Sequence, residues 1–180
     1  MPFRSRRPSE GLGRRRLLLQ ALAALPATLA GCGLGGSSAP VGEPLPDIEL
    51  ADLDGRRHRL LDSTGAPLLI NVWATWCPPC RAEMASLERL YRALAPHGLR
   101  LLGITVDEDL NLTREYLLHS RISFPIRSDP GGNRLADLLK TRAIPATLLV
   151  GRDGRIGRLV IGERVWDEGE ARAWVDALLA

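Results

Sequence analysis

Two cysteines separated by two prolines, Cys77-Pro78-Pro79-Cys80, most constrain what this chain of 180 residues can fold into. The apolar run before them, residues 68–74, is typical of a buried strand, and an amphipathic pattern predicts a helix over 78–94. This order places both thiols at the N-terminus of a helix that leaves the edge of a sheet. Unpaired N–H groups and the helix dipole favour a thiolate there. A favoured thiolate with a second cysteine one turn away is what disulfide exchange requires.

The basic character of the chain belongs to its N-terminus. The net charge is +3, but six arginines and only one acid, Glu10, lie within the first 31 residues. The remainder holds 18 basic and 20 acidic side chains, a net charge of −2. Residues 32–180 therefore offer no electrostatic basis for binding nucleic acid. An apolar content of 45% is enough to form a hydrophobic core.

Residues 1–31 predict an export signal. Arg14-Arg15-Arg16 precedes an apolar stretch, 17–30, that is shorter than the roughly 20 residues needed to span a bilayer. The following Leu29-Ala30-Gly31-Cys32 resembles a bacterial lipobox, which implies that Cys32 is lipidated and holds the protein on the periplasmic side of a membrane. A plain cleaved signal with an incidental cysteine, or an uncleaved anchor, is the alternative. Twin-arginine and general export are both open.

The mature chain divides into a short tether, 32–42, rich in Gly, Ser and Pro, and a folded domain, 43–180. Strands that alternate with helices, followed by a hairpin and a last helix, predict an α/β domain with a mixed central sheet and helices on both faces. The predicted strands are 48–50, 58–61, 68–73, 99–106, 124–126, 147–150 and 156–161, and the predicted helices are 78–94, 111–120, 132–140 and 167–179.

Four segments resemble the thioredoxin fold, in its TlpA/ResA-type branch of exported, membrane-tethered thiol-disulfide oxidoreductases. They are the active-site strand and turn at 71–80, the segment 81–84 with an acidic residue three positions after the second cysteine, the cis-proline loop at 143–147, and an extra N-terminal β-hairpin formed by 42–47 with 52–55. The resemblance itself extends over residues 41–180, which is nearly all of the mature chain. The resemblance implies a thioredoxin fold with that additional hairpin.

The two cysteines have distinct predicted roles. Cys77, at the start of the helix, is the attacking thiol, and Cys80 is the resolving thiol. Pro78 and Pro79 have no N–H, so only the Cys80 N–H is left to stabilise the Cys77 sulfur. With few bonds to the thiolate, we expect a reducing or middling couple rather than a strongly oxidising one.

Glu83 is the predicted proton acceptor for Cys80. It lies three residues further along the helix and projects from the same face. The resemblance implies that it lines the active-site cavity. Asn71 stands where cytosolic thioredoxins have a buried Asp, and because an amide does not titrate, proton transfer falls to Glu83. The alternative is an ordinary first-turn carboxylate that faces solvent.

The resemblance also implies a substrate-binding edge. Pro145 would be cis and would face the dithiol, and the backbone of Ile144 would pair with an extended substrate segment. A trans proline that opens a strand is the alternative. Trp76 is expected at the surface beside the thiols, whereas Trp166 is expected to be structural. Residues 107–109 are expected to form a solvated loop in which Asp109 caps a helix.

Three other functions compete for the same cysteines. A zinc site needs about four ligands, and one C-x-x-C is a poor start. A peroxiredoxin would need Pro and Thr where Ile70 and Ala74 stand, so that interpretation is weak. A Cu(I)-binding metallochaperone using both thiolates is the serious alternative. Copper-delivery relatives of the fold, however, usually place three residues between the cysteines and add His and Met ligands.

The sequence therefore predicts an exported thiol-disulfide oxidoreductase that acts through a Cys77–Cys80 redox disulfide without a further cofactor or metal. The resemblance suggests net reduction of client-protein disulfides, for example those of cytochrome c or copper-site assembly. It also implies electrons supplied by a transmembrane carrier of the DsbD/CcdA type.

Overall fold

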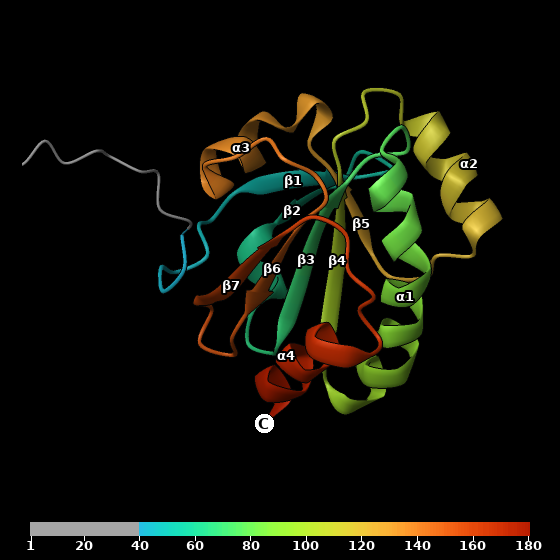
Figure 1. The fold of residues 1–180 in the computed structure, drawn as a ribbon. Coiled ribbons are helices and arrows are strands. Elements are labelled where there is room, and N and C mark those ends of the chain that lie inside the picture. The colour runs from blue at the N-terminus through green and yellow to red at the C-terminus, as the bar shows by residue number, and fades with distance from the viewer. Residues whose placement is uncertain (1–39) are drawn as a thin grey trace, which may run out of the picture. The chain divides into compact units, whose positions relative to one another are not determined.

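The computed structural model describes residues 40–180, so the predicted export signal, Cys32 and most of the tether lie outside the described residues. One seven-stranded sheet runs through the described part, in the order β2-β1-β5-β4-β3-β6-β7 (Figure 1). The strands are β1 (Glu49–Asp52), β2 (Arg57–Arg59), β3 (Leu68–Trp73), β4 (Arg100–Thr105), β5 (Ile126–Ser128), β6 (Ala146–Val150) and β7 (Ile156–Ile161). The helices are α1 (Pro78–Leu94), α2 (Leu110–Ser120), α3 (Asn133–Leu139) and α4 (Gly169–Leu179), with short 3-10 turns η1 (Leu60–Ser63), η2 (Ala95–His97) and η3 (Pro130–Gly132).

The sheet is mixed, as predicted. β3, β4 and β5 run parallel, and β6, β7, β1 and β2 are added in antiparallel pairs. β1 and β2 form the expected N-terminal hairpin, whose turn is closed by the Gly55 N–H donating to the Asp52 carbonyl at 3.0 Å. Because β3 and β4 are parallel neighbours, the loops that follow them meet at one edge of the sheet. The dithiol lies at that edge.

Helices cover both faces of the sheet, which confirms the predicted architecture. Leu69 and Trp73 of β3 point into a core shared with α1 and α4, whereas Ile70 and Val72 point into a second core closed by α3. The two-residue alternation of a strand explains how one apolar run serves both cores. Figure 1 shows α1 and α2 on one side of the central strands and α3 on the other. No helix between residues 40 and 180 has the length and apolarity needed to cross a bilayer.

Several predicted strands end or begin at other residues, and two of these differences have a clear local cause. The strand expected at 58–61 stops at Arg59, because Leu60, buried at 2% exposure, enters a 3-10 turn that the Thr64 hydroxyl closes on the carbonyl of Leu61. The strand expected at 124–126 begins at Ile126 instead. Pro125 has no N–H to contribute to a ladder, although its carbonyl accepts from the Gly103 N–H of β4.

Candidate active site

Cys77 caps the N-terminus of α1 and forms a disulfide with Cys80, their Cα atoms 5.3 Å apart. The Cys80 N–H donates to the Cys77 sulfur at 3.3 Å, while Pro78 and Pro79 occupy the first two helical positions and donate nothing. The expected single backbone donor is thus confirmed. Cys77 is 4% exposed and Cys80 is fully buried, so Cys77 is the more exposed residue of the pair.

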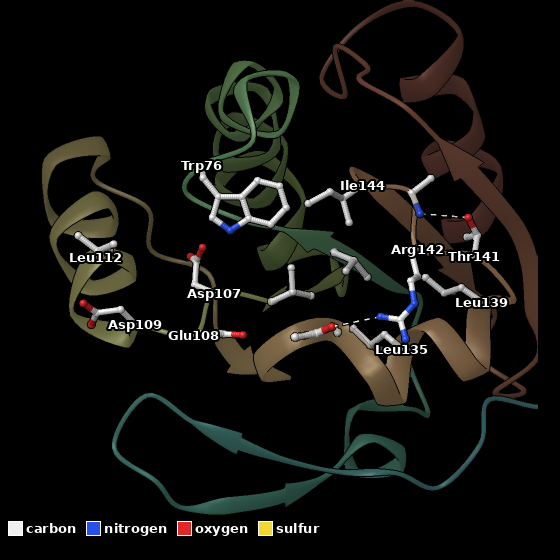
Figure 2. A pocket seen from close by; sticks show the side chains of 15 residues that line it. Trp76, Asp107, Glu108, Asp109, Leu112, Leu135, Leu139, Thr141, Arg142 and Ile144 are labelled. Carbon is white, nitrogen blue, oxygen red and sulfur yellow. Dashed lines mark hydrogen bonds between the residues drawn. The ribbon is translucent and has the colours of Figure 1, made fainter.

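An open groove of about 460 Å³ lies beside the dithiol turn. Trp76, 67% exposed, and Leu112, 53% exposed, contribute apolar surface that is unusual for a solvent-facing position. Figure 2 shows Trp76 and Ile144 near one another over the groove, with the acidic residues 107–109 on one side and Arg142 on the other. The apolar lining comes from Val72, Val106, Leu112, Leu135, Leu139 and Ile144. Such a surface suits a peptide segment better than a small polar metabolite.

The loop before β6 brings Ile144 and Pro145 to this groove. The peptide bond between them is cis, as expected, and Pro145 is buried with its carbonyl accepting from the Gly162 N–H at 2.8 Å. Ile144 is half-buried and lines the groove. Within residues 40–180 its own N–H and carbonyl make no hydrogen bond. A neighbouring extended chain could therefore pair with this residue as an added strand does.

Glu83 lies on the buried face of α1, is 1% exposed and does not line the groove. One of its carboxylate oxygens accepts from the Asn71 amide at 2.7 Å, and the other accepts from the Trp166 indole at 3.0 Å and the Arg164 N–H at 3.2 Å. The solvent-facing alternative for this residue is therefore wrong. It shares a helix face with Cys80, three residues earlier, within the α1 side of the core.

Burial raises the pKa of the Glu83 carboxyl above that of an ordinary glutamate, although the bonds from Trp166, Asn71 and Arg164 act in the opposite direction. The neighbouring charge of Glu163 raises it further. The carbonyl oxygen of the Asn71 amide is buried without a hydrogen-bond partner.

The loop after β4 corrects one expectation. Asp109 does cap α2, accepting from the Asn111 N–H at 2.9 Å, but Asp107 is not solvated. It is 2% exposed and accepts hydrogen bonds from Thr75, Thr105 and Thr113. The reason is topological: the residues that follow β3 and β4 meet at one edge, and Thr75 supplies donors to the carboxylate. That adjacency of parallel strands was the signal that could have revealed the contact.

Trp166 was expected to be structural only, yet its indole N–H is one of the three donors to Glu83. Its backbone N–H also donates to the Ser86 hydroxyl at 3.0 Å, which fixes the segment before α4 against α1. No local pattern marks a tryptophan 83 positions away as a partner of Glu83. A contact of that range depends on the docking of α4 and not on periodicity.

Comparison with known proteins agrees with this geometry. The family model described as "AhpC/TSA family" matches residues 41–158. The thiol-disulfide oxidoreductase ResA of Geobacillus thermodenitrificans is 31% identical over 150 residues, covering 83% of this chain and 86% of that protein.

Two solved structures share the fold. A Chlorobium tepidum protein assigned as thiol:disulfide interchange protein DsbE gives a TM-score of 0.72 at 24% identity, covering 79% of this chain and 100% of the other. A secreted thiol-disulfide isomerase from Corynebacterium glutamicum gives 0.66 at 25% identity, covering 75% and 83%. With a thioredoxin-like sheet, a C-x-x-C disulfide at the start of α1 and this match over most of its length, the chain belongs to the AhpC/TSA family.

Proposed function

We propose that this thiol-disulfide oxidoreductase is exported and reduces disulfide bonds of client proteins through Cys77 and Cys80. The observation that carries the proposal is the position of Cys77: at the N-cap of α1, more accessible than Cys80, with one backbone donor to its sulfur. A thiolate held by so few bonds is only moderately stabilised. The dithiol is then readily oxidised to the disulfide, which favours net reduction of the client.

The reaction is a pair of sulfur exchanges. In the reduced protein, the Cys77 thiolate attacks one sulfur of the client disulfide, that S–S bond breaks, and a mixed disulfide forms while the other client sulfur leaves as a thiolate. The Cys80 thiol then loses its proton and attacks the Cys77 sulfur. The Cys77–Cys80 disulfide forms and the second client sulfur leaves. Two electrons pass in total from the protein to the client; the Cys80 thiol releases one proton, and the client thiolates take up protons from solvent.

Glu83 is the group we assign to the second exchange. Cys80 is fully buried, and an apolar site disfavours ionisation of a thiol. Glu83 has a raised pKa from the same burial and lies one turn further along α1, so it is suited to take that proton directly or through water. Its fixed contacts with Asn71 and Trp166 keep the carboxylate in place between cycles.

The groove is the surface we assign to the client. An extended client segment would pair with the free backbone of Ile144 and lay apolar side chains against Trp76. Clients with cysteines that must be reduced before they bind haem or copper fit this role. A transmembrane electron carrier of the DsbD/CcdA type would return electrons to the dithiol.

Export is supported by the N-terminal sequence and by relatives. The structure of the Corynebacterium glutamicum relative is described as that of a secreted protein. The lipobox-like run ending at Cys32 suggests attachment to a membrane on the periplasmic side, with the segment 32–42 as tether. Labelling cells with a radioactive fatty acid should mark the wild-type chain and leave a Cys32→Ala variant unmarked.

Trapping tests the main proposal. A Cys80→Ser variant should accumulate mixed disulfides with its clients, because the second exchange cannot occur, whereas the matched Cys77→Ser variant should trap none. The clients are then identified by mass spectrometry after release with a reductant. Tight stoichiometric Cu(I) binding by the wild-type protein, with no exchange against a disulfide substrate, would instead favour the metallochaperone alternative.

A further inference from the structure

A second buried carboxylate, Asp107, supports the turn that carries the dithiol. Its side chain is buried in the loop between β4 and α2. The Thr75 N–H donates to both carboxylate oxygens at 3.1 Å, and the Thr75 hydroxyl donates at 3.1 Å. The hydroxyls of Thr105 and Thr113 each donate at 2.8 Å. The carboxylate thus joins three segments of chain: the turn after β3, the end of β4 and the first turns of α2.

The connection to the cysteines is short. Thr75 stands two residues before Cys77, and the Cys77 N–H donates to the Ala74 carbonyl at 3.3 Å. A further backbone bond, from the Val106 N–H to the Trp73 carbonyl at 2.9 Å, ties the bases of the two loops together. A displacement of the Asp107 carboxylate would therefore also displace Cys77, the residue that caps α1.

Within the described part of the chain, no cationic side chain forms an ion pair with Asp107 at an N···O distance of up to 4.0 Å. Its sequence neighbours Glu108 and Asp109 are also acidic. Hydroxyls and one N–H satisfy its hydrogen bonds but supply no opposite charge. A negative charge fixed in a site of low dielectric constant acts on its neighbours more strongly than one in water.

We propose that Asp107 is a positioning residue that holds the turn before Cys77, and that its charge lowers the reduction potential of the Cys77–Cys80 couple. The inference rests on the proposed function of that dithiol. Reduction of the disulfide takes up two electrons and two protons and allows Cys77 to ionise. A nearby negative charge opposes that ionisation, makes the reduced form less favourable, and so makes the dithiol the better electron donor.

The test is the equilibrium of the full-length protein with glutathione. Asp107→Asn removes the charge and keeps the shape. We expect the equilibrium to shift about tenfold towards the dithiol, which corresponds to about 30 mV for a two-electron couple. Asp107→Ser also removes the charge, although its shorter side chain does not reach as far towards the Thr75 N–H, and it should shift the equilibrium in the same direction. Thr113→Val removes a hydrogen bond but leaves the charge, so its equilibrium should move less than about twofold.

The outcomes separate the ideas. The inference is overturned if Asp107→Asn or Asp107→Ser folds and keeps the reduction potential of the wild type. It is also overturned if Thr113→Val shifts the potential by as much as Asp107→Asn does, because the effect would then follow from a lost hydrogen bond and not from the charge. A wild-type protein that fails to exchange with glutathione at all overturns the proposed function first, and this inference with it.

Discussion

Two buried carboxylates flank the redox disulfide, and they are held in different ways. Glu83, on the buried face of α1, accepts from an amide, an indole and one backbone N–H. Asp107, beyond the end of β4, accepts from three hydroxyls and one backbone N–H. Burial raises the pKa of Glu83. The side-chain oxygen of Asn71, whose amide nitrogen donates to Glu83, has no hydrogen-bond partner. The two sites therefore differ in structure: the one we propose for proton transfer has an unpartnered amide oxygen next to it, whereas the donors of the one we propose for positioning join three segments of chain.

The largest effect we expect comes from Glu83→Gln. If Glu83 takes the proton of Cys80, its loss should slow resolution of the mixed disulfide about 100-fold near pH 7, at the low end of what general base catalysis contributes. The measurement is rapid-quench analysis of the exchange between the reduced protein and a model disulfide. Mass spectrometry or gel analysis of the quenched samples should show that the mixed disulfide persists longer in Glu83→Gln than in the wild type.

Glu88→Gln is the matched control for that experiment. Glu88 lies on the same helix, but its carboxylate accepts from Ser123 and Arg92 and contacts no part of the dithiol turn. Its exchange rate should equal that of the wild type. Equal rates in wild type and Glu83→Gln would remove the proton-transfer role and leave Glu83 as a structural group only.

The Asp107 site should respond mainly in stability when its donors are removed. Thr113→Val deletes one hydroxyl and leaves a buried carboxylate short of a donor, which should cost about 1–3 kcal/mol of unfolding free energy. Thr113→Ser keeps the hydroxyl and should cost less. Urea unfolding with an unchanged m-value measures the difference. A Ser variant that loses as much as the Val variant would show that methyl packing, and not the hydrogen bond, stabilises this site.

What the sequence could predict of these two sites depended on the range of each contact. The strand-dithiol-helix order and the positions of Cys77, Cys80 and Glu83 follow from local patterns, and the structure places all three at the N-cap and in the first turns of α1. The bond from Trp166 to Glu83 joins positions 83 residues apart, and the bond from Thr75 to Asp107 joins positions 32 apart. Hydrophobic periodicity predicts that elements pack, but it does not say which polar groups meet between them.

The raised pKa of Glu83 gives a pH dependence with a definite sign. The folded protein holds this proton more tightly than the unfolded chain, so the stabilisation is complete below the ordinary glutamate pKa of about 4.3 and is lost as pH rises through the folded value. The contribution changes by at most about 1.4 kcal/mol per pH unit. In urea unfolding of the disulfide form, the unfolding free energy of the wild type minus that of Glu83→Gln should therefore fall as the pH rises above about 4.3. Parallel curves would contradict the raised pKa.

The smallest effect should come from the ion pair next to Trp166. Arg89 of α1 binds both oxygens of Asp167, at 2.6 and 3.0 Å, and its side chain is 59% exposed. Exposed pairs are screened by water, so Arg89→Met, which keeps the apolar stem, should cost less than about 1 kcal/mol and leave the exchange rate unchanged. Thermal unfolding and the same rapid-quench assay measure both. A slower exchange would mean that the Trp166–Glu83 contact depends on this surface pair, and the Glu83 site would then extend from the core to solvent, unlike the enclosed site of Asp107.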